Sequence, residues 1–551
     1  MSFDPLAFKN QFPLFSHSDN KNLIYLDNAA TTQKPHTVIE AISNFYSSIN
    51  ANAHRSSHRL ARQTTELIET TRTATRNFLN AKYNEEVIFC RGATEALNLV
   101  AHGVTHTLSA GDEIILTTAE HHANLVPWQL QADTHNLSIK YLDSSNLGLN
   151  IQQLKNSLSE KTKVVSITGA SNTLGFLNDL EAIKALLPPE VIFIVDAAQL
   201  AAHRMIDVQA LDCDFLVFSS HKLYGPSGLG ICYGKKTTLE TLPPWQGGGE
   251  MVQQVKLNGT NFASTPHRFE AGTSSLAAIA SFNACLDFWN MQERNQIERH
   301  EAELTQYLHT ELNSMESIIL NSTAENNVGI TNFSIAPNKQ LAAEDIAHLL
   351  DSQDIAIRAG HHCTQPLHAA MNIPHSIRVS VAAYNTQNDI ERFLETLKNI
   401  IANTTPYKVS NNTQTKNFKT QHQQLKEISL EELESISGWQ QRYKTIMQWS
   451  RYLISNKEIQ LAENQVKGCE SQTWMAHSNI EGKNYFLIDS ESRIVKGLGA
   501  ILLLLINGKP KKAISAVELE KKFQALGLEK HLSPSRSNGF KALVTAALDK
   551  I

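Results

Sequence analysis

Short apolar runs alternate with helical patterns of apolar and polar positions between about residues 20 and 285. Helical spacing falls between the runs, for example over 93–102 and 180–187. This alternation predicts an α/β domain built on a doubly wound sheet, parallel or mixed, with helices packed against it. The predicted strands are 87–90, 113–116, 164–168, 191–196, 215–219 and 230–233.

The rest of the chain divides by its pattern into three further parts. A long amphipathic helix is predicted over about 282–307, and a smaller α+β segment follows it to about residue 403. The polar, proline-containing stretch that comes next has few core residues and predicts a linker. A new globular pattern begins near residue 428. We therefore expect one domain over 1–403 (a large part at about 20–285, and a small part from the N-terminal segment and about 286–403), a linker over 404–425 and a second domain over 426–551.

Composition and charge narrow the class of protein. The 551 residues are 42% hydrophobic and 19% charged, which is typical of globular chains of several domains. No basic segment followed by an apolar stretch opens the chain, and the longest apolar run, 498–506, falls short of the roughly 20 residues of a membrane span. With a net charge of −5 and no arginine-rich stripe, nucleic acid is not expected as a partner. The six cysteines lack metal-ligand spacing, so we expect a cytoplasmic protein with no metal site and no membrane partner.

Two polar residues end neighbouring predicted strands. Asp196 closes the run 191–196, and Lys222 follows the run 215–219 together with Ser219 and His221. A lysine in a pocket that lowers its pKa suits a Schiff base beside a bound phosphate. A buried carboxylate needs a cationic partner, such as the pyridinium nitrogen of pyridoxal phosphate (PLP). A surface lysine after a core strand would show the same local pattern, but its coincidence with Asp196 favours a cofactor pocket.

Polar groups follow two further predicted strands. A helix is predicted to begin within the segment 91–95. The small residues of this segment and the hydroxyl of Thr94 would allow a phosphate to bind at the helix N-terminus. Many strand–turn–helix corners share this pattern. The segment 120–128 supplies the paired histidines His121 and His122, one of which could stack on a cofactor ring, although a lone histidine there is more often structural.

A cysteine lies in a polar loop rather than in an apolar run. Cys363 follows His361 and His362, with Arg358 a few residues before it. Imidazoles and a guanidinium make an electropositive setting that favours the thiolate. A buried, inert cysteine would be expected in an apolar run, so this pattern favours a functional thiol.

Taken together, these segments carry a resemblance to a known family. Residues 1 to about 404 resemble a SufS-type (group II) cysteine desulfurase, a class V PLP enzyme of fold type I. That fold combines a large sheet domain with a small α+β domain. The residue after Thr273 is Ser274, where the family commonly has proline. The matching segments are Tyr25-Leu-Asp-Asn-Ala-Ala, Arg91-Gly-Ala-Thr-Glu-Ala, Glu120-His-His-Ala-Asn, Val195-Asp-Ala-Ala-Gln, Ser219-Ser-His-Lys, Arg268-Phe-Glu-Ala-Gly-Thr and Arg358-Ala-Gly-His-His-Cys.

The resemblance implies a role for each of the residues singled out above. Lys222 would hold PLP in a Schiff base and move the substrate proton, Asp196 would pair with the ring nitrogen, and His122 would stack on the ring. The implied cofactor contacts are Thr94, His122, Asp196, Gln199, Ser219, His221, Lys222 and, across a dimer interface, Thr273. The implied substrate contacts are Asn172, Arg358 and Arg378. Cys363 would be the nucleophile that receives the sulfur.

The C-terminal region resembles a second family, the SufE-type sulfur acceptors. The matching segments are 464–474, 489–498 and 532–539, and their implied fold is a separate α+β domain. Cys469 lies on a glycine-bearing turn next to Lys467, which predicts an exposed thiol beside a cation. In this reading Arg536 stabilises a thiolate or persulfide, and Cys469 accepts sulfur from Cys363.

The function implied by both resemblances is conversion of L-cysteine to L-alanine, with sulfur passing from Cys363 to Cys469. The implied assembly is a homodimer that supplies downstream scaffold proteins of iron–sulfur cluster assembly. Two alternatives stay open. The first is a selenocysteine lyase or another class V PLP enzyme. The second is an interaction protein whose C-terminal domain only recruits a scaffold or activates the desulfurase.

Overall fold

The computed structural model describes residues 3–54, 57–337, 341–403, 414–453, 459–469, 471–528, 532 and 534–551. The chain separates into two compact units. The first comprises residues up to Ser334 together with Asp354–Glu395, and the second comprises Ile335–Gln353 and Thr396–Ile551. A short internal segment belongs with the C-terminal unit, and the domain bounds expected from the sequence stay a prediction. No helix within the described residues is long and apolar enough to cross a bilayer.

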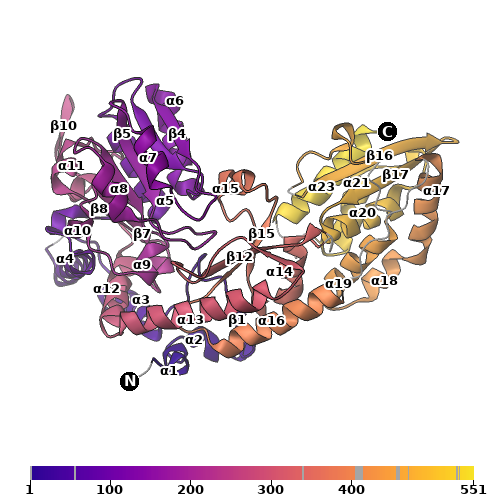
Figure 1. Ribbon diagram of the computed structural model, residues 1–551, viewed down its shortest axis with the longest axis horizontal. Coiled ribbons are helices and arrows are strands. Elements are labelled where there is room, and N and C mark those ends of the chain that lie inside the picture. Colours follow the sequence, from indigo (N-terminus) through magenta and orange to yellow (C-terminus); the bar gives the residue numbers. More distant parts are fainter. Residues whose placement is uncertain are drawn as a thin grey trace. The chain divides into compact units, whose positions relative to one another are not determined.

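A seven-stranded mixed sheet forms the centre of the first unit (Figure 1). The strands β3, β4, β5, β6 and β7 run parallel, whereas β8 is antiparallel to both of its neighbours, β7 and β2. In spatial order the strands are β2 (Val87–Cys90), β8 (Gly230–Gly234), β7 (Phe215–Ser219), β6 (Ile192–Asp196), β5 (Thr162–Thr168), β3 (Glu113–Thr117) and β4 (Ser138–Leu142).

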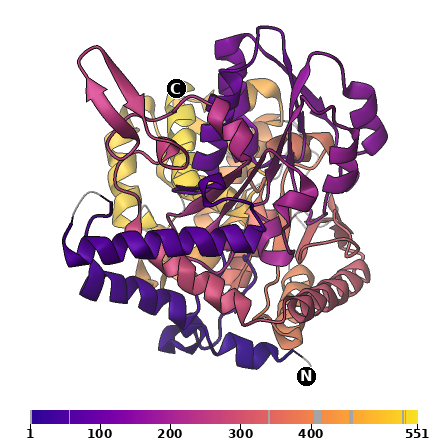
Figure 2. The ribbon, with the colours of Figure 1, turned by 90° about the vertical axis from the view of Figure 1, so that its left-hand side faces the viewer.

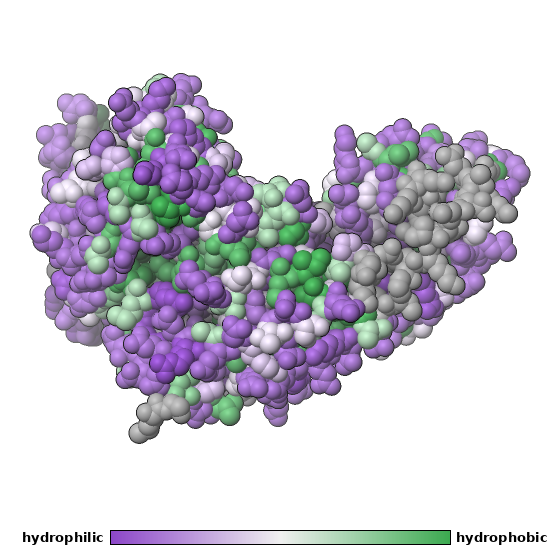
Figure 3. All heavy atoms as spheres, in the orientation of Figure 1, coloured by the Kyte–Doolittle hydropathy of each residue, from purple (hydrophilic) through white to green (hydrophobic). Residues whose placement is uncertain are grey.

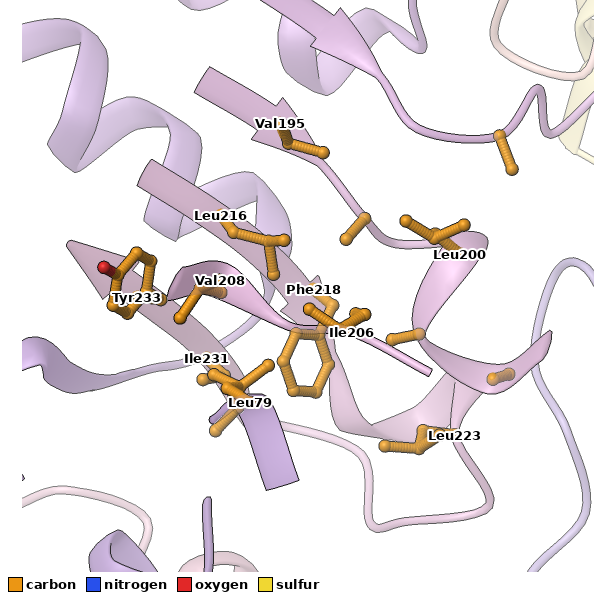
Figure 4. Packing of buried hydrophobic residues seen from close by; sticks show 14 of the residues in the cluster. Leu79, Val195, Leu200, Ile206, Val208, Leu216, Phe218, Leu223, Ile231 and Tyr233 are labelled. Carbon is orange, nitrogen blue, oxygen red and sulfur yellow. The ribbon is translucent and has the colours of Figure 1, made fainter. Parts of the chain in front are cut away.

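Both faces of this sheet are covered, which is why its central strands are apolar at nearly every position. Leu216 and Phe218 of β7 pack into one buried cluster with Val208 and Ile231, as Figure 4 shows. Val217, from the same strand, packs on the opposite face with residues of the helix α5 (Ala93–Thr105). Hydrophilic side chains cover most of the surface visible in Figure 3.

Most predicted strands of the large sheet agree closely with the structure, whereas one strand was missed and two other predictions differ from it. The strand β4 was not predicted, because it lies at the sheet edge with Ser138 and Tyr141 exposed. The predicted long helix over 282–307 is two helices, α12 (Leu276–Asn290) and α13 (Arg294–Asn313). Within the predicted linker, residues 404–413 lie outside the described part of the chain, and Gln414–Gln424 forms the helix α17. Phe418 anchors α17 by packing with Trp474.

A four-stranded sheet in the order β11–β12–β15–β14 forms the smaller part of the first unit. Its strands are β11 (Ile318–Leu320), β12 (Ile330–Ile335), β15 (Ser376–Ser380) and β14 (Arg358–Gly360). The loop that carries Cys363 lies between β14 and the short helix α15 (Gln365–Ala370). The antiparallel pairing of Gly360 with Ser376 holds the start of this loop against the sheet.

The hairpin of β9 (Val252–Lys256) and β10 (Gly259–Phe262) projects from the first unit (Figure 2). Its apolar residues Val255, Leu257 and Phe262 are exposed. Exposed apolar residues gathered on one feature are typical of a surface that a partner covers.

The C-terminal unit packs helices against the hairpin of β16 (Thr473–Ile480) and β17 (Lys483–Ser490). The helix α20 (Arg493–Ile506) is almost wholly buried, since Leu498, Ile501 and Leu502 belong to one apolar cluster of this unit. Other described helices of this unit include α14 (Ala343–Asp351), α18 (Leu430–Ser435), α19 (Trp439–Trp449), α21 (Ala516–Ala525) and α23 (Pro534–Asp549).

A glycine allows the helices α19 and α20 to approach closely. A Cβ atom at Gly497 would overlap the carbonyl oxygen of Ile446, a backbone atom that cannot move alone. We expect Gly497→Ala to lower the free energy of unfolding of this unit by about 1–3 kcal/mol, as overpacking does. Urea denaturation checks this, with Gly438→Ala as the control, because nothing lies near a Cβ at Gly438. Equal stability of the two variants would contradict the expected overlap.

Candidate active site

A cavity of about 210 Å³ lies at the carboxyl ends of β5, β6 and β7, where open α/β sheets bind ligands. It collects most of the residues singled out from the sequence, although they come from distant segments of the chain. Its polar lining residues are Thr94, His121, Thr168, Asn172, Asp196, Gln199, Ser219, His221, Lys222, Arg358, His362 and Arg378.

Lys222 and Asp196 face this cavity from neighbouring strand ends. Burial lowers the pKa of Lys222 to about 8, while the charge of Asp196 acts in the opposite direction. The carboxylate of Asp196 is buried, and its Oδ1 accepts a hydrogen bond from the Ala198 N–H at 2.9 Å. Burial raises the pKa of Asp196. A cationic ligand atom beside this carboxylate would offset its desolvation.

The opposite end of the cavity is suited to an anion. The helix α5 begins there with Gly92 as its N-cap and no side-chain cap, and the Ala93 N–H donates to Ser219 Oγ at 2.8 Å. A Cβ at Gly230 would overlap the backbone of Gly92, so glycine lets β8 lie against this turn. Helix N–H groups together with the hydroxyls of Thr94 and Ser219 are a typical phosphate donor set.

Further contacts hold the polar side chains at this end of the cavity. The Nδ1 atom of His221 lies 3.1 Å from Thr31 Oγ1, and burial lowers the pKa of His221 to about 4. Gln199 donates from Nε2 to the carbonyl oxygen of Ala29 at 2.8 Å. The set as a whole fits PLP: an amine for the aldehyde carbon, a carboxylate for the ring nitrogen and donors for the phosphate.

The two neighbouring histidines take different positions. His121 lines the cavity, and burial, with the nearby charge of Lys222, lowers its pKa to about 3. His122 does not line it; its backbone N–H donates to the Cys363 carbonyl at 2.9 Å, and its Nε2 accepts from the Gln365 N–H at 3.3 Å. The sequence-based assignment of the ring contact to His122 does not match this geometry, which points to His121. Adjacent residues in one motif could not be told apart by pattern alone.

Two arginines and an amide face the cavity from the other side. Arg378 is buried and donates to Asn172 O at 2.9 Å and to Asp27 Oδ1 at 2.7 Å, and its Nε atom is buried without a partner. A substrate carboxylate could take up this remaining donor. Arg358 donates from Nη2 to Cys363 Sγ at 3.7 Å.

The Cys363 loop is fastened to residues of the cavity. Asn172 donates from Nδ2 to the carbonyl oxygen of His362 at 2.7 Å, next to the cysteine. Cys363 is half-buried and has a φ of +60°, and His362 has a φ of +50°. Such left-handed backbone is uncommon for residues other than glycine and is often found at functional sites.

Thr273 is not part of this cavity. It lines a separate depression that includes Asn52, His54 and Glu270. Its assignment as a cofactor contact required a second subunit, so that assignment stays a prediction. Among the described residues, no group of three or more His, Cys, Asp and Glu side chains could hold a metal ion.

Cys469 lies in the C-terminal unit and differs in part from the predicted setting. Its thiol is half-buried rather than exposed, it lies 3.5 Å from the carbonyl oxygen of Gly539, and burial raises its pKa. The predicted neighbour Lys467 is exposed. Arg536 stacks its guanidinium over the ring of Tyr443 at 5.4 Å. A stabilising contact between Arg536 and Cys469 therefore stays a prediction.

Comparisons with known proteins identify both parts of the chain. The family described as Aminotransferase class-V matches residues 24–393, and the SufE family, described as Fe-S metabolism associated domain, matches residues 427–550. A cysteine desulfurase of Pectobacterium atrosepticum is 40% identical over 405 residues, covering 73% of this chain and 98% of that protein. One from Yersinia pestis is 41% identical over 405 residues, covering 73% of this chain and 99% of that protein.

Solved structures lead to the same family. The crystal structure of the cysteine desulfurase CsdA from Escherichia coli has a TM-score of 0.67 and 33% identity, covering 74% of this chain and 100% of that one. An apo structure of a cysteine desulfurase from Thermococcus onnurineus has a TM-score of 0.69 and 31% identity, covering 73% of this chain and 100% of that one. The predicted fold and both family resemblances are thereby confirmed. The chain belongs to the cysteine desulfurases, PLP enzymes of the class-V aminotransferase family, and carries a SufE domain at its C-terminal side.

Proposed function

We propose that this chain converts L-cysteine into L-alanine, that Cys363 takes up the sulfur, and that Cys469 receives it from Cys363. The observation that carries the first step is the hydrogen bond from Asn172, a lining residue of the Lys222 cavity, to the backbone beside Cys363. It ties the thiol loop to the wall of the cavity. A nucleophile must be held in this way if it is to meet a substrate bound there.

The cavity residues divide between cofactor and substrate. Lys222 would hold PLP, Asp196 would pair with its ring nitrogen, His121 would lie against its ring, and Gln199 would bond the ring oxygen. Thr94, Ser219 and His221 would hold the phosphate. When bound, PLP supplies an electron sink that stabilises negative charge at the substrate Cα.

Proton transfer at the substrate Cα falls to Lys222. Burial that lowers its pKa to about 8 increases the fraction of free amine at neutral pH. The substrate carboxylate would be held by Arg378, whose Nε atom has no other partner, and by Asn172. Arg358, which contacts Cys363 Sγ, would bring the thiol and the substrate together.

The sulfur steps balance without an external oxidant. The Cys363 thiolate attacks the substrate Sγ, an S–S bond forms and the Cβ–S bond breaks. The electron pair and protons that remain give L-alanine, and Cys363–SH becomes Cys363–S–SH. Cys469 then attacks the outer sulfur, which yields Cys469–S–SH and regenerates Cys363–SH. Because both thiols belong to one chain, the second step needs no encounter between separate proteins. We propose iron–sulfur cluster assembly as the destination of this sulfur.

We also propose that the enzyme acts as a homodimer through its first unit. The exposed hairpin residues Val255, Leu257 and Phe262 offer apolar surface that a second subunit would cover. Exposed Thr273, which does not line the Lys222 cavity of its own chain, would then be free to complete the phosphate site of the partner.

The Cys469→Ser variant tests the acceptor role. We expect the first turnover to keep its rate, because the Lys222 cavity is unchanged, and delivery of sulfur to an added acceptor thiol to fall about 10²-fold, because intramolecular transfer is lost. Mass spectrometry of the wild-type protein after L-cysteine treatment should show one added sulfur atom on the Cys469 peptide. Delivery is followed with radiolabelled cysteine.

Ser478→Ala, at the far end of β16, is the matched control and should deliver sulfur as the wild type does. Wild-type delivery by the Cys469→Ser variant, with no added sulfur on the Cys469 peptide of the wild type, would favour the alternative in which this domain only recruits or activates.

A further inference from the structure

The hydroxyl of Ser376, at the start of β15, is the centre of a buried hydrogen-bonded cluster. Asn332 donates from Nδ2 to Ser376 Oγ at 2.8 Å. The Nε2 atoms of His362 and His368 lie 3.1 Å and 3.0 Å from the same oxygen. All four side chains are at most 4% exposed, so water cannot replace these contacts.

The protons of this cluster can be assigned from the partners. Asn332 Oδ1 accepts from Asn321 Nδ2 at 2.8 Å, which makes its Nδ2 the donor to Ser376. His368 Nδ1 lies 3.1 Å from the carbonyl oxygen of Thr364, which can only accept, so Nδ1 carries the proton. Burial lowers the pKa of His368 to about 4 and that of His362 well below its usual range, so both rings are neutral at neutral pH.

One arrangement satisfies every contact to the hydroxyl, and it leaves the buried Nδ1 atom of His362 as an acceptor without a partner among the described residues. A neutral His368 protonated on Nδ1 must accept at Nε2, so the single Ser376 proton goes to His368. His362 must then donate from Nε2 to Ser376 Oγ. The resulting chain runs from His362 through Ser376 and His368 to the carbonyl of Thr364.

This chain of hydrogen bonds begins and ends next to Cys363. His362 precedes Cys363, and Thr364 follows it. We propose that Ser376 is a positioning residue that joins the two flanks of Cys363 and holds its left-handed backbone in place for attack on the substrate. The effect of Ser376 on the reaction depends on the proposed role of Cys363, whereas its effect on the conformation of the loop does not.

Removing the hydroxyl should release the loop but leave substrate binding intact. In the Ser376→Ala variant three buried polar groups lose their common partner, and the loop can reach other conformations. A nucleophile displaced by about 1 Å costs roughly 10²-fold in rate. We therefore expect kcat for alanine formation to fall by about 10- to 100-fold. KM for L-cysteine and the visible absorption of bound PLP should stay close to those of the wild type.

The matched control is Thr331→Val on the adjacent strand β12. The Thr331 hydroxyl is buried without a partner, so its removal breaks no hydrogen bond, and the variant should keep wild-type kinetics. Hydrogen–deuterium exchange of the peptide 358–368 supplies a readout that does not depend on activity. Faster exchange is expected in Ser376→Ala and not in Thr331→Val. Should Ser376→Ala fail to fold, His368→Phe removes the same link while keeping a ring of similar size.

Wild-type kcat and wild-type exchange in the Ser376→Ala variant would overturn the proposal, and so would equal losses in Thr331→Val. A lowered kcat with a matching rise in KM would also overturn it, since that pattern indicates a damaged substrate site. If Cys363→Ser still desulfurates L-cysteine, the proposed function fails, and the exchange experiment still decides whether Ser376 holds the loop.

Discussion

Replacing Lys222 with alanine is expected to reduce alanine formation from L-cysteine by about 10³-fold or more, because in the proposed mechanism this residue moves the Cα proton and holds the cofactor. The buried amine has its pKa lowered to about 8, and no other residue that lines the cavity is a lysine, so none of them can replace Lys222 in a Schiff base. The measurement is alanine production, followed together with the visible absorption of bound PLP. Borohydride reduction should attach PLP to the Lys222 peptide of the wild type and to no peptide of the variant.

A surface lysine supplies the control for this substitution. Lys161 is exposed in the turn just before β5, and Lys161→Ala should keep both the absorption and the activity. Adding a small primary amine to the Lys222→Ala variant should restore part of the rate, because the missing base is then replaced from solution. Full turnover by Lys222→Ala without added amine would remove the proton-transfer role.

The strands of the large sheet could be predicted because burial on both faces requires apolar residues at nearly every position of a strand. Every residue of Phe215–Ser219 and Val87–Cys90 is buried, so each strand is a continuous apolar run bounded by polar or small residues. Lys222 and Asp196 could be found for the same reason. Each is a polar residue at the end of such a run, where the sheet topology must bring both to one edge.

The elements that were not predicted lack a distinctive pattern of apolar residues. The edge strand β4 is half-exposed, and its composition is close to that of a loop. The break between α12 and α13 at Met291–Glu293 contains neither glycine nor proline, so the helical pattern runs through it. The helix α17 is polar except for Phe418, whose partner Trp474 lies far along the chain.

Contacts between distant side chains were the least accessible part of the active site. The motif at 120–124 contains two adjacent histidines, and only the structure shows that His121 lines the cavity while His122 braces the Cys363 loop. The cluster around Ser376 joins four segments, and no local pattern connects Asn332 with His368. Half-burial of Cys469 likewise depends on α23, some 70 residues farther along the chain.

Replacing Cys363 with serine separates loading of the cofactor from removal of sulfur. The cavity proposed to bind PLP keeps all its polar groups, so the visible absorption and its change on adding L-cysteine should persist. Alanine formation should fall by about 10³-fold or more, since loss of a nucleophile removes most of the rate of an enzyme that depends on it. A serine hydroxyl is a weak nucleophile toward sulfur and cannot carry a persulfide. Alanine release in a single turnover is the measurement.

The control is Cys213→Ala, which removes a thiol from the apolar core. Burial raises the pKa of Cys213 to about 12, so it stays protonated and has no part in the chemistry. Assaying Cys363→Ser with L-selenocysteine as well as L-cysteine tests the selenocysteine lyase alternative, because the weaker C–Se bond can break without an attacking thiol. If Cys363→Ser loses activity on L-cysteine but keeps activity on L-selenocysteine, the Cys363 thiol is required only to take sulfur from the substrate. Undiminished alanine release from L-cysteine would show that the attacking sulfur lies elsewhere.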